Sequence, residues 1–278
     1  MGILDKLRLD GKIAIVTGAG RGLGRAMAVA LADAGADIVA TARTQGQIDE
    51  TAELVRDNGR RCLAVSCDVT DSDSVRSMVD AALGEFGRID VLVNNAGIGT
   101  ARPREESEDG YELTFQVNYL TPFLLTRRLL PLIERSAPAR IVNVSSAGQA
   151  PIDFDDVMLE RHYSGAQAYC QSKLALVMFT FDLAEELEGT GVTANCLHPG
   201  TYMPTQMVRD AGVDPVTPLE DGIAATMRLI TSPEVEGING HYFDGTSESA
   251  PHPQAEDPEA RRQLRELSAE LTGIQAAA

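Results

Sequence analysis

A tyrosine and a lysine four residues apart, Tyr169 and Lys173, are the side chains of this sequence with the clearest potential for chemistry. On a helix, positions i and i+4 share one face, so the phenol and the ammonium would project together. A free tyrosine titrates near pH ~10, and a neighbouring cation favours its phenolate form, which brings it into the range of acid–base catalysis. Such pairs are also common on solvated helix faces, so the case for catalysis depends on the rest of the chain.

A glycine-rich turn follows the first expected strand, Lys12–Thr17, and runs directly into a helix. Glycine lets the backbone turn tightly and approach a pyrophosphate, whose charge the helix N-terminus stabilises. A purely structural turn is the alternative, but the position after the first strand favours a dinucleotide site. The residues expected to line this site are Gly18, Arg21, Gly22, Leu23 and Gly24.

The end of the second expected strand, Asp37–Thr41, indicates which dinucleotide is bound. NAD sites usually carry an acidic residue there for the ribose hydroxyls, whereas NADP sites offer arginine. Here Ala42 and Arg43 follow the strand, and Arg21 lies in the glycine-rich turn. Two guanidinium groups can bind a 2′-phosphate through charge-assisted hydrogen bonds, although both are also ordinary surface residues. The sequence therefore favours NADP(H) over NAD(H).

Short β-branched segments alternate with longer helical patterns along most of the chain. This alternation predicts a single Rossmann-type doubly wound α/β domain over residues 1–246, with a parallel sheet of about seven strands and helices on both faces. Residues 247–278 are expected to form an acidic C-terminal extension with a terminal helix. The expected strands are Lys12–Thr17, Asp37–Thr41, Cys62–Ser66, Asp90–Asn94, Arg140–Ser145, Val192–Cys196 and His241–Phe243. The expected helices are Leu23–Ala34, Gln47–Asn58, Ser72–Phe86, one or two within Glu108–Glu134 with a bend near Pro122, Ala168–Glu188, Leu219–Ile230 and Glu259–Leu271.

Composition argues against several classes of function. The net charge of −17 disfavours nucleic acid or an anionic membrane surface as a partner. The four cysteines show no metal-binding spacing, so no metal site is expected, and they are typical of free thiols in a reducing compartment. No apolar run approaches the length of a membrane span, and Met1–Asp10 carries too many charges for a signal peptide. A cytoplasmic protein is expected.

With these pieces in place, the chain resembles the short-chain dehydrogenase/reductase family from Gly11 to about Gly245, and its C-terminal half is similar to the retinol-dehydrogenase-like branch. The resemblance implies an NAD(P)-dependent oxidoreductase acting on CH–OH or C=O groups, commonly a homo-oligomer. A non-catalytic NADP-binding regulatory protein on the same fold is the alternative. The motifs that carry the resemblance are Thr17-Gly18-x-x-x-Gly22-x-Gly24, Cys67-Asp68-Val69, Asn94-Asn95-Ala96-Gly97, Asn118, Ser145-Ser146, Tyr169-x-x-x-Lys173 and His198-Pro199-Gly200.

The resemblance implies four catalytic residues. Tyr169 would be the general acid in reduction and the general base in oxidation. Lys173 would hold the nicotinamide ribose and lower the pKa of the tyrosine. Ser146 would orient the substrate oxygen, with Ser145 as the lesser candidate. Asn118 would anchor a water that links Lys173 to bulk solvent.

The resemblance also implies further contacts with the cofactor. The position at which the family usually has a threonine for the nicotinamide carboxamide is Pro204 in this chain. Thr205 is the preferred substitute and Thr201 the second choice. The implied adenine contacts are Asp68 and Val69, and the residues implied to flank the cofactor are Asn95 and Gly97.

Ser146 and Tyr169 are 23 positions apart, which is more than the family's commoner spacing. The additional stretch, Ile152–His162, could form a turn or helix at the rim of the substrate cleft, or an idle surface insertion, and the sequence leaves both open. The loops expected to line the cleft carry several apolar side chains, which suits a fairly apolar carbonyl or alcohol as the small-molecule substrate.

Overall fold

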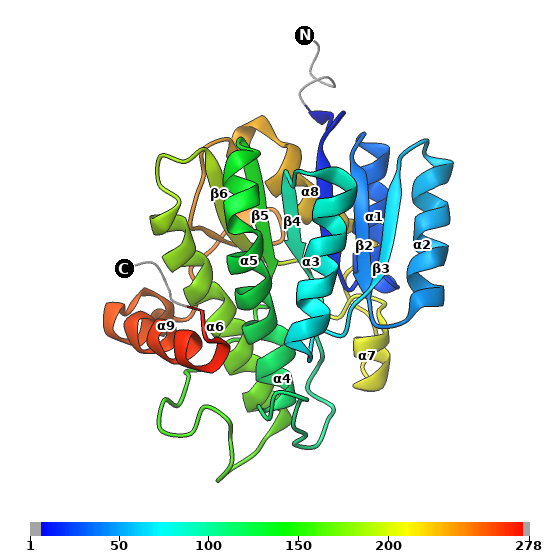
Figure 1. Ribbon diagram of the computed structural model, residues 1–278. Coiled ribbons are helices and arrows are strands. Elements are labelled where there is room, and N and C mark those ends of the chain that lie inside the picture. The colour runs from blue at the N-terminus through cyan, green and yellow to red at the C-terminus, as the bar shows by residue number, and fades with distance from the viewer. Residues whose placement is uncertain (1–6, 275–278) are drawn as a thin grey trace.

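Eight strands form one sheet in the computed structural model, which describes residues 7–274 (Figure 1). The strand order is β3-β2-β1-β4-β5-β6-β7-β8, and every neighbouring pair is parallel except β7 with β8. The doubly wound α/β fold predicted from the sequence is confirmed. The strands are β1 (Ile13–Thr17), β2 (Asp37–Ala42), β3 (Cys62–Ser66), β4 (Val91–Asn94), β5 (Ala139–Val144), β6 (Val192–His198), β7 (Tyr242–Asp244) and β8 (Ser247–Glu248).

Two predictions concern the ends of the chain. The expectation that Met1–Asp10 is no signal peptide rests partly on residues 1–6, which lie outside the described part. Strand β8 is additional to the seven expected strands and continues the sheet just beyond residue 246. Its two residues are too few to show the alternation by which strands are recognised in a sequence.

Helices cover both faces of the sheet, with α1 and α8 together on one face and α3, α5 and α6 on the other (Figure 1). The helical elements are α1 (Gly22–Asp33), α2 (Gln45–Asp57), α3 (Ser72–Phe86), α4 (Leu113–Phe115), the π-helix η2 (Gln116–Leu120), α5 (Thr121–Arg135), α6 (Gly165–Glu186), α7 (Gln206–Asp210), α8 (Leu219–Thr231), the short 3₁₀ helices η3 (Pro233–Val235) and η4 (Pro253–Glu256), and α9 (Pro258–Thr272).

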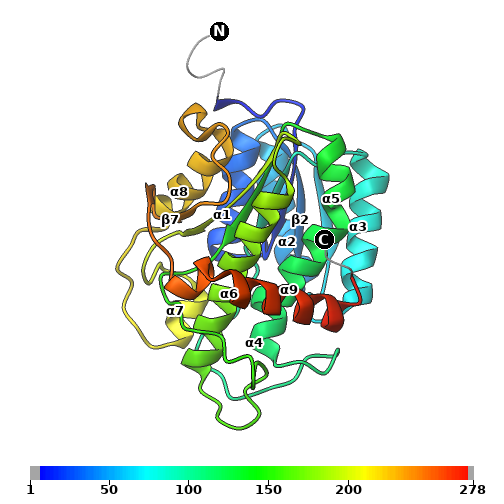
Figure 2. The same cartoon turned by 90° about the vertical axis from the view of Figure 1, so that its left-hand side faces the viewer.

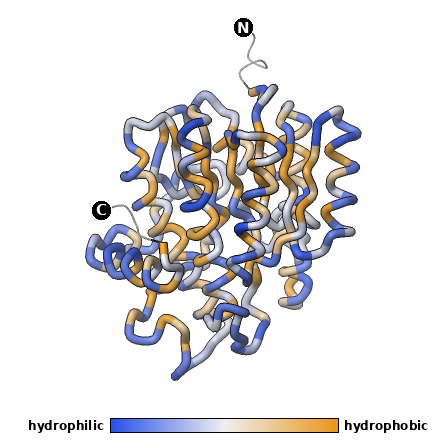
Figure 3. Tube along the Cα trace, in the orientation of Figure 1, coloured by the Kyte–Doolittle hydropathy of each residue, from blue (hydrophilic) through white to orange (hydrophobic). Residues whose placement is uncertain are grey.

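Burial on both faces explains why the central strands are mainly apolar and do not alternate between apolar and polar residues. Every residue of β1 and every residue of β6 is buried. One apolar cluster fills the space between the sheet and α3, α5 and α6 and extends to α9, while a second lies under α1 and α8. Figure 3 shows the outcome, with apolar residues concentrated on the strands and largely hydrophilic outer surfaces on α2 and α9.

The helical region after β4 begins later than predicted. The residues before Leu113 form a turn in which Glu106 and Glu112 pair through a β-bridge, so the helix does not begin at Glu108. The buried Glu112 carboxylate then caps the helix by accepting hydrogen bonds from the backbone N–H groups of Thr114 and Phe115, at 3.0 and 2.7 Å. The irregularity expected near Pro122 is the π-helix η2, which directly precedes α5.

The stretch Ile152–His162 contains turns and no helix. Ile152, Val157 and Leu159 are all buried, and the Gln171 side chain of α6 donates a hydrogen bond to the Val157 carbonyl at 2.8 Å. Since its apolar residues join the core, this stretch is not an idle surface insertion. It lies near the carboxyl ends of the strands, together with α4 and α7 (Figure 1).

The C-terminal helix α9 confirms the predicted helix Glu259–Leu271 and packs across α6 (Figure 2). Asp182 of α6 accepts hydrogen bonds from Arg261 at 2.6 Å and from Arg265 at 2.8 Å. Leu264 on the inner face of α9 is buried. The extension is therefore part of the same packed unit as the sheet.

Asp90 ties the first residues of β1 and β4 together and generates a prediction. Its buried carboxylate accepts hydrogen bonds from the Ile13 N–H at 3.0 Å, from Lys12 Nζ at 2.8 Å and from Arg88 Nε at 2.9 Å. Asp90→Asn removes the charge that these cations face, so we expect it to lower the free energy of unfolding by about 3 kcal/mol at pH 7. Urea unfolding would measure this loss.

The difference in free energy of unfolding between wild type and Asp90→Asn should depend on pH. Burial alone would raise the pKa of Asp90, but the hydrogen bonds from Arg88, Lys12 and Ile13 outweigh it and hold the pKa below the usual value. The stabilisation is therefore present above pH ~4 and is lost as the pH falls through the folded-state pKa. The difference between wild type and Asp90→Asn should shrink at pH ~3, whereas the exposed-site control Asp33→Asn should change stability by less than about 0.5 kcal/mol. Equal losses in the two variants would contradict this account.

Candidate active site

Helix α6 places Tyr169 and Lys173 on one face, with Lys173 Nζ lying 5.7 Å from the centroid of the tyrosine ring. The start of α6 packs very closely on the loop after β4. A Cβ atom on Gly165 would lie 2.1 Å from the Thr100 carbonyl oxygen, so only glycine allows this approach. The close approach brings the face of α6 that carries Tyr169 and Lys173 against the carboxyl end of the sheet.

Lys173 is a buried amine without an ion-pair partner among the described residues. Burial lowers its pKa to about 8. Its Nζ donates a hydrogen bond to the Val144 carbonyl at 2.9 Å, at the last residue of β5. The ammonium is thus held at the carboxyl end of β5, and its pKa allows it to gain or lose a proton near neutral pH.

Tyr169 lies beside Ser146, because Ser146 Oγ and a carbon of the Tyr169 ring lie 3.5 and 3.8 Å from the point a Cβ atom would take on Gly148. Burial raises the pKa of Tyr169 above its usual value, and the hydrogen bond with Ser146 opposes this rise. The lowering of the Tyr169 pKa by Lys173 stays a prediction; the Lys173 ammonium is hydrogen-bonded to the Val144 carbonyl.

The two consecutive serines after β5 have different surroundings. The Ser145 hydroxyl donates a hydrogen bond to the Lys173 carbonyl at 2.9 Å and so fastens α6 to the sheet. The Ser146 oxygen accepts a hydrogen bond from the Gly148 N–H at 3.0 Å and lies beside Tyr169. The structure therefore brings Ser146, and not Ser145, to the phenol.

Asn118 lies in the π-helix η2 and is fully buried. Its side chain exchanges two hydrogen bonds with the backbone of Ile98, at 2.9 and 3.1 Å, and donates a third to the Ser172 hydroxyl at 3.1 Å. A Cβ atom on Gly97 would lie 3.2 Å from Asn118 Oδ1 and 3.6 Å from Lys173 Nζ. Asn118 and Lys173 therefore converge on the same small space beside Gly97.

The glycine-rich turn lies at the carboxyl end of β1. Gly18 and Gly22 have φ angles of +68° and +54°, which favour glycine. A Cβ atom on Gly24 would lie 2.3 Å from the Gly18 carbonyl oxygen, closer than any real contact. Asn95 supports the turn from the next loop, because its amide donates a hydrogen bond to the Thr17 carbonyl at 2.8 Å. Leu23 is buried at the start of α1, where its side chain packs toward Gly222 of α8.

These features fit a dinucleotide phosphate, because the turn leads into the N-terminus of a 12-residue helix. Arg21 precedes this helix and Arg43 follows β2, and both side chains are exposed. Within the described part of the chain, neither guanidinium has a hydrogen-bond or ion-pair partner. Both are therefore available to an anionic ligand.

Asp68 and Val69, which the resemblance implies as adenine contacts, also lie beyond the carboxyl end of a strand. Asp68 follows β3, and its carboxylate accepts hydrogen bonds from the Thr70 N–H at 2.9 Å and the Thr70 hydroxyl at 2.8 Å, which fixes its orientation. The carbonyl of Val69 accepts a hydrogen bond from the Thr121 hydroxyl, so Val69 is tied to the start of α5.

The two candidate threonines occupy different places. The Thr205 methyl lies 3.6 Å from the point a Cβ atom would take on Gly22, directly before the unpredicted helix α7. The Thr201 hydroxyl lies 3.1 Å from His198 Nε2. The structure thus brings Thr205, and not Thr201, to the glycine-rich turn.

Tyr242 is a site residue to which the sequence assigned no role. Its hydroxyl donates a hydrogen bond to the Ser146 carbonyl at 3.1 Å, so β7 supports the residue that contacts Tyr169. Nothing in the sequence signals this contact, because it depends on how β7 aligns with the loop after β5.

Comparisons with known proteins agree with this geometry. The family model for short chain dehydrogenases matches residues 12–215. Retinol dehydrogenases 13 and 14 of Homo sapiens are each 38% identical to this chain, covering 98% and 96% of it and 88% of each relative. A crystal structure of an uncharacterised protein from Mycobacterium paratuberculosis superposes with a TM-score of 0.80 at 28% identity, covering 98% of this chain and 97% of that one.

A doubly wound sheet with a dinucleotide turn and a Tyr–Lys helix defines an NAD(P)-dependent oxidoreductase. The chain belongs to the short-chain dehydrogenase/reductase family and acts on CH–OH or C=O groups, and its sequence relatives place it in the retinol-dehydrogenase-like branch. Among residues 7–274, none of the helices is both long enough and apolar enough to cross a membrane.

The close approach at Gly24 predicts the effect of adding one methyl group. Gly24→Ala places a carbon against the Gly18 carbonyl, so the turn must shift away from the position a pyrophosphate needs. We expect the dissociation constant for NADP(H) to rise at least about tenfold. Titration by nucleotide fluorescence would measure it.

Gly84→Ala is the matched control. Gly84 lies on the exposed side of α3, and an added Cβ atom meets nothing within 4 Å. This change should leave nucleotide affinity unchanged and stabilise the protein by about 0.5–1 kcal/mol. Wild-type affinity in Gly24→Ala would refute the assignment of the turn.

Proposed function

We propose that the protein is an NADP-preferring oxidoreductase that exchanges a hydride with a carbonyl or secondary alcohol, with Tyr169 as its general acid and base. The observation that carries the proposal is the convergence of Tyr169 and Ser146 on Gly148, with the buried Lys173 amine 5.7 Å from the centroid of the tyrosine ring. When bound, the nicotinamide supplies or accepts the hydride.

The residues of the chain divide the remaining work. Ser146 faces Tyr169 and is oriented by the Gly148 N–H, so its hydroxyl is placed to hydrogen-bond the substrate oxygen. Tyr169 transfers the proton to that oxygen in reduction and removes it in oxidation. Lys173, with a pKa of about 8, stands next in line to exchange a proton with the phenol. Asn118 lies beside Lys173 and fixes the distance between η2 and α6 through Ser172.

Two positively charged side chains support the proposed preference for NADP(H). Arg21 and Arg43 are exposed near the ends of β1 and β2, and β2 ends without the acidic residue that would bind a ribose 2′-hydroxyl. A 2′-phosphate would receive hydrogen bonds from both guanidinium groups.

A fairly apolar substrate is proposed from the loop that carries α7. Met207 lies directly against Gly99, and Tyr202 and Val216 expose apolar surface nearby in the sequence. The human relatives are named for retinol, an apolar alcohol, which agrees with this choice of substrate class. The cytoplasmic location and the homo-oligomeric state expected from the sequence stay predictions.

Tyr169→Phe tests the mechanism, because it removes the proton that the reaction needs and keeps the ring. We expect kcat for carbonyl-dependent NADPH oxidation to fall by about 10³-fold, with NADPH affinity retained. Tyr163→Phe is the matched control, since position 167 is Gln and Tyr163 lacks a lysine partner. Near-wild-type turnover in Tyr169→Phe would sink the mechanism, and a wild-type protein that binds NADPH but reduces no member of a broad carbonyl panel would favour the regulatory alternative.

Arg43→Ala and Arg21→Ala test the cofactor preference. Each should weaken NADPH binding by about tenfold and leave NADH binding nearly unchanged, because only NADPH carries the 2′-phosphate. Arg135→Ala, an exposed arginine at the end of α5, should change neither dissociation constant. Equal or tighter binding of NADH by the wild-type protein would overturn the preference.

A further inference from the structure

Two adjacent buried residues of the π-helix η2, Asn118 and Tyr119, contact different parts of the structure. Asn118 faces the candidate site, where it bonds Ile98 and Ser172. The next residue, Tyr119, is 1% exposed, and its hydroxyl is hydrogen-bonded to the Ser268 hydroxyl of α9. A residue from the C-terminal extension therefore contacts the direct sequence neighbour of a candidate catalytic residue, 149 positions earlier in the chain.

The direction of this hydrogen bond follows from the donors available. The single hydroxyl proton of Ser268 is donated to the Leu264 carbonyl at 2.6 Å, within α9. Tyr119 must therefore be the donor to the Ser268 oxygen. Burial raises the pKa of Tyr119, so the phenol keeps its proton over the whole working range of pH.

Ser268 is itself firmly placed. Arg261 and Arg265 of α9 both bind Asp182 of α6, and Ser268 is completely buried. Helix α6 also carries Tyr169 and Lys173. Helix α9 therefore fixes η2 relative to the same helix that holds the rest of the candidate site.

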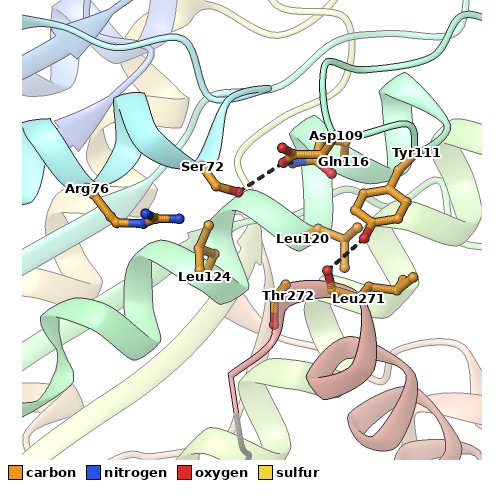
Figure 4. Close-up of a pocket in the computed structure, with 9 residues that line it drawn as sticks. All are labelled: Ser72, Arg76, Asp109, Tyr111, Gln116, Leu120, Leu124, Leu271 and Thr272. Carbon is orange, nitrogen blue, oxygen red and sulfur yellow. Dashed lines mark hydrogen bonds between the residues drawn. The ribbon is translucent and has the colours of Figure 1, made fainter.

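A pocket borders one flank of η2, whose five residues are all buried. This pocket of about 260 Å³ lies against Gln116 and Leu120 of η2 and against Leu271 at the end of α9 (Figure 4). The ring of Tyr119 packs against the tilted rings of Phe115 and Phe123, with centroid distances of 5.0 and 6.3 Å. A π-helix departs from the regular helical hydrogen-bond ladder and persists where its surroundings impose it. The hydrogen bond to Ser268 supplies a directional constraint of that kind.

We propose that the Tyr119–Ser268 hydrogen bond makes α9 a positioning element for Asn118, so that the C-terminal extension controls the geometry beside Lys173. This inference rests on the proposed function, in which Asn118 belongs to the catalytic set. Tyr119 and Ser268 are positioning residues, because neither touches the reacting groups.

Three variants of the full chain test the proposal. Ser268→Ala leaves the buried phenol without an acceptor, so kcat should fall about tenfold or more while KM for NADPH stays unchanged. Tyr119→Phe removes the donor but leaves Ser268 bonded to Leu264, so kcat should fall only about fivefold. The double variant should match Tyr119→Phe, because it contains no unpaired phenol.

Tyr111→Phe is the matched control. The Tyr111 hydroxyl donates to the Leu271 carbonyl at 2.7 Å, a second hydrogen bond to α9 that does not involve η2 (Figure 4). Wild-type kcat is expected for this variant. A loss in Tyr111→Phe equal to that in Tyr119→Phe would mean that any loosening of α9 has the same effect, and the proposal would fail.

A spectroscopic readout separates this proposal from the proposed function. In protein labelled with ¹⁵N-asparagine, the side-chain amide signal of Asn118 can be assigned by its loss in Asn118→Asp. The signal should shift in Tyr119→Phe and Ser268→Ala and remain in place in Tyr111→Phe. An unshifted signal overturns the positioning role even where Tyr169→Phe abolishes turnover, whereas a shifted signal combined with an active Tyr169→Phe overturns only the catalytic assignment. Tyr119→Phe carries the test by itself if Ser268→Ala does not fold.

Discussion

The burial of the Lys173 amine is the constraint around which the candidate site is organised. An ammonium taken out of water is costly unless it is paired, and this one has the Val144 carbonyl at 2.9 Å and no carboxylate among the described residues. The result is a pKa of about 8 in place of 10.5. Buried amines of this kind are characteristic of functional sites, because a purely structural role would favour an ion pair or an apolar residue.

The surroundings of Lys173 follow from the parallel sheet. Strands β4 and β5 end side by side, so the loop with Gly97 and the end of β5 at Val144 reach the ammonium from adjacent positions. A Cβ atom at position 97 would crowd Asn118 Oδ1 at 3.2 Å and would touch Lys173 Nζ at 3.6 Å, an ordinary contact distance. The Ser145 hydroxyl donates a hydrogen bond to the backbone carbonyl of Lys173. This bond fixes the backbone of α6 at the residue that carries the amine.

The features that sequence patterns predict well are those determined by local chemistry. Buried parallel strands are mainly apolar, so seven of the eight strands could be located, and the glycines of the glycine-rich turn are marked by their spacing. Ser145 and Ser146 could not be separated in this way, since both carry a hydroxyl at the end of a strand. Only the structure shows that successive side chains there point to different partners, Ser145 to the α6 backbone and Ser146 to Tyr169.

The π-helix η2 could be predicted only as an irregularity, which Pro122 marks two residues beyond it. Its own sequence, Gln116–Leu120, has no glycine or proline to show that the irregularity is a π-helix. Its register depends on contacts distant in the chain, with Ile98 on one side and Ser268 on the other. Patterns within a window of a few residues carry no information about such contacts.

Helix α6 links these distant contacts into one mechanical unit. Its N-terminal half presents Tyr169 and Lys173 to the sheet edge, and its C-terminal half presents Asp182 to the two arginines of α9. Because an α-helix advances about 1.5 Å per residue, the ion pairs lie only about 14 Å along the axis from the ammonium. Detaching α9 would expose Leu264, leave Asp182 without its cations and leave the Tyr119 phenol unpaired, so these losses would occur together. The docking of α9 on α6 is therefore coupled to the pairing of Tyr119. In the proposed arrangement, the position of Asn118 is only as well defined as the docking of α9.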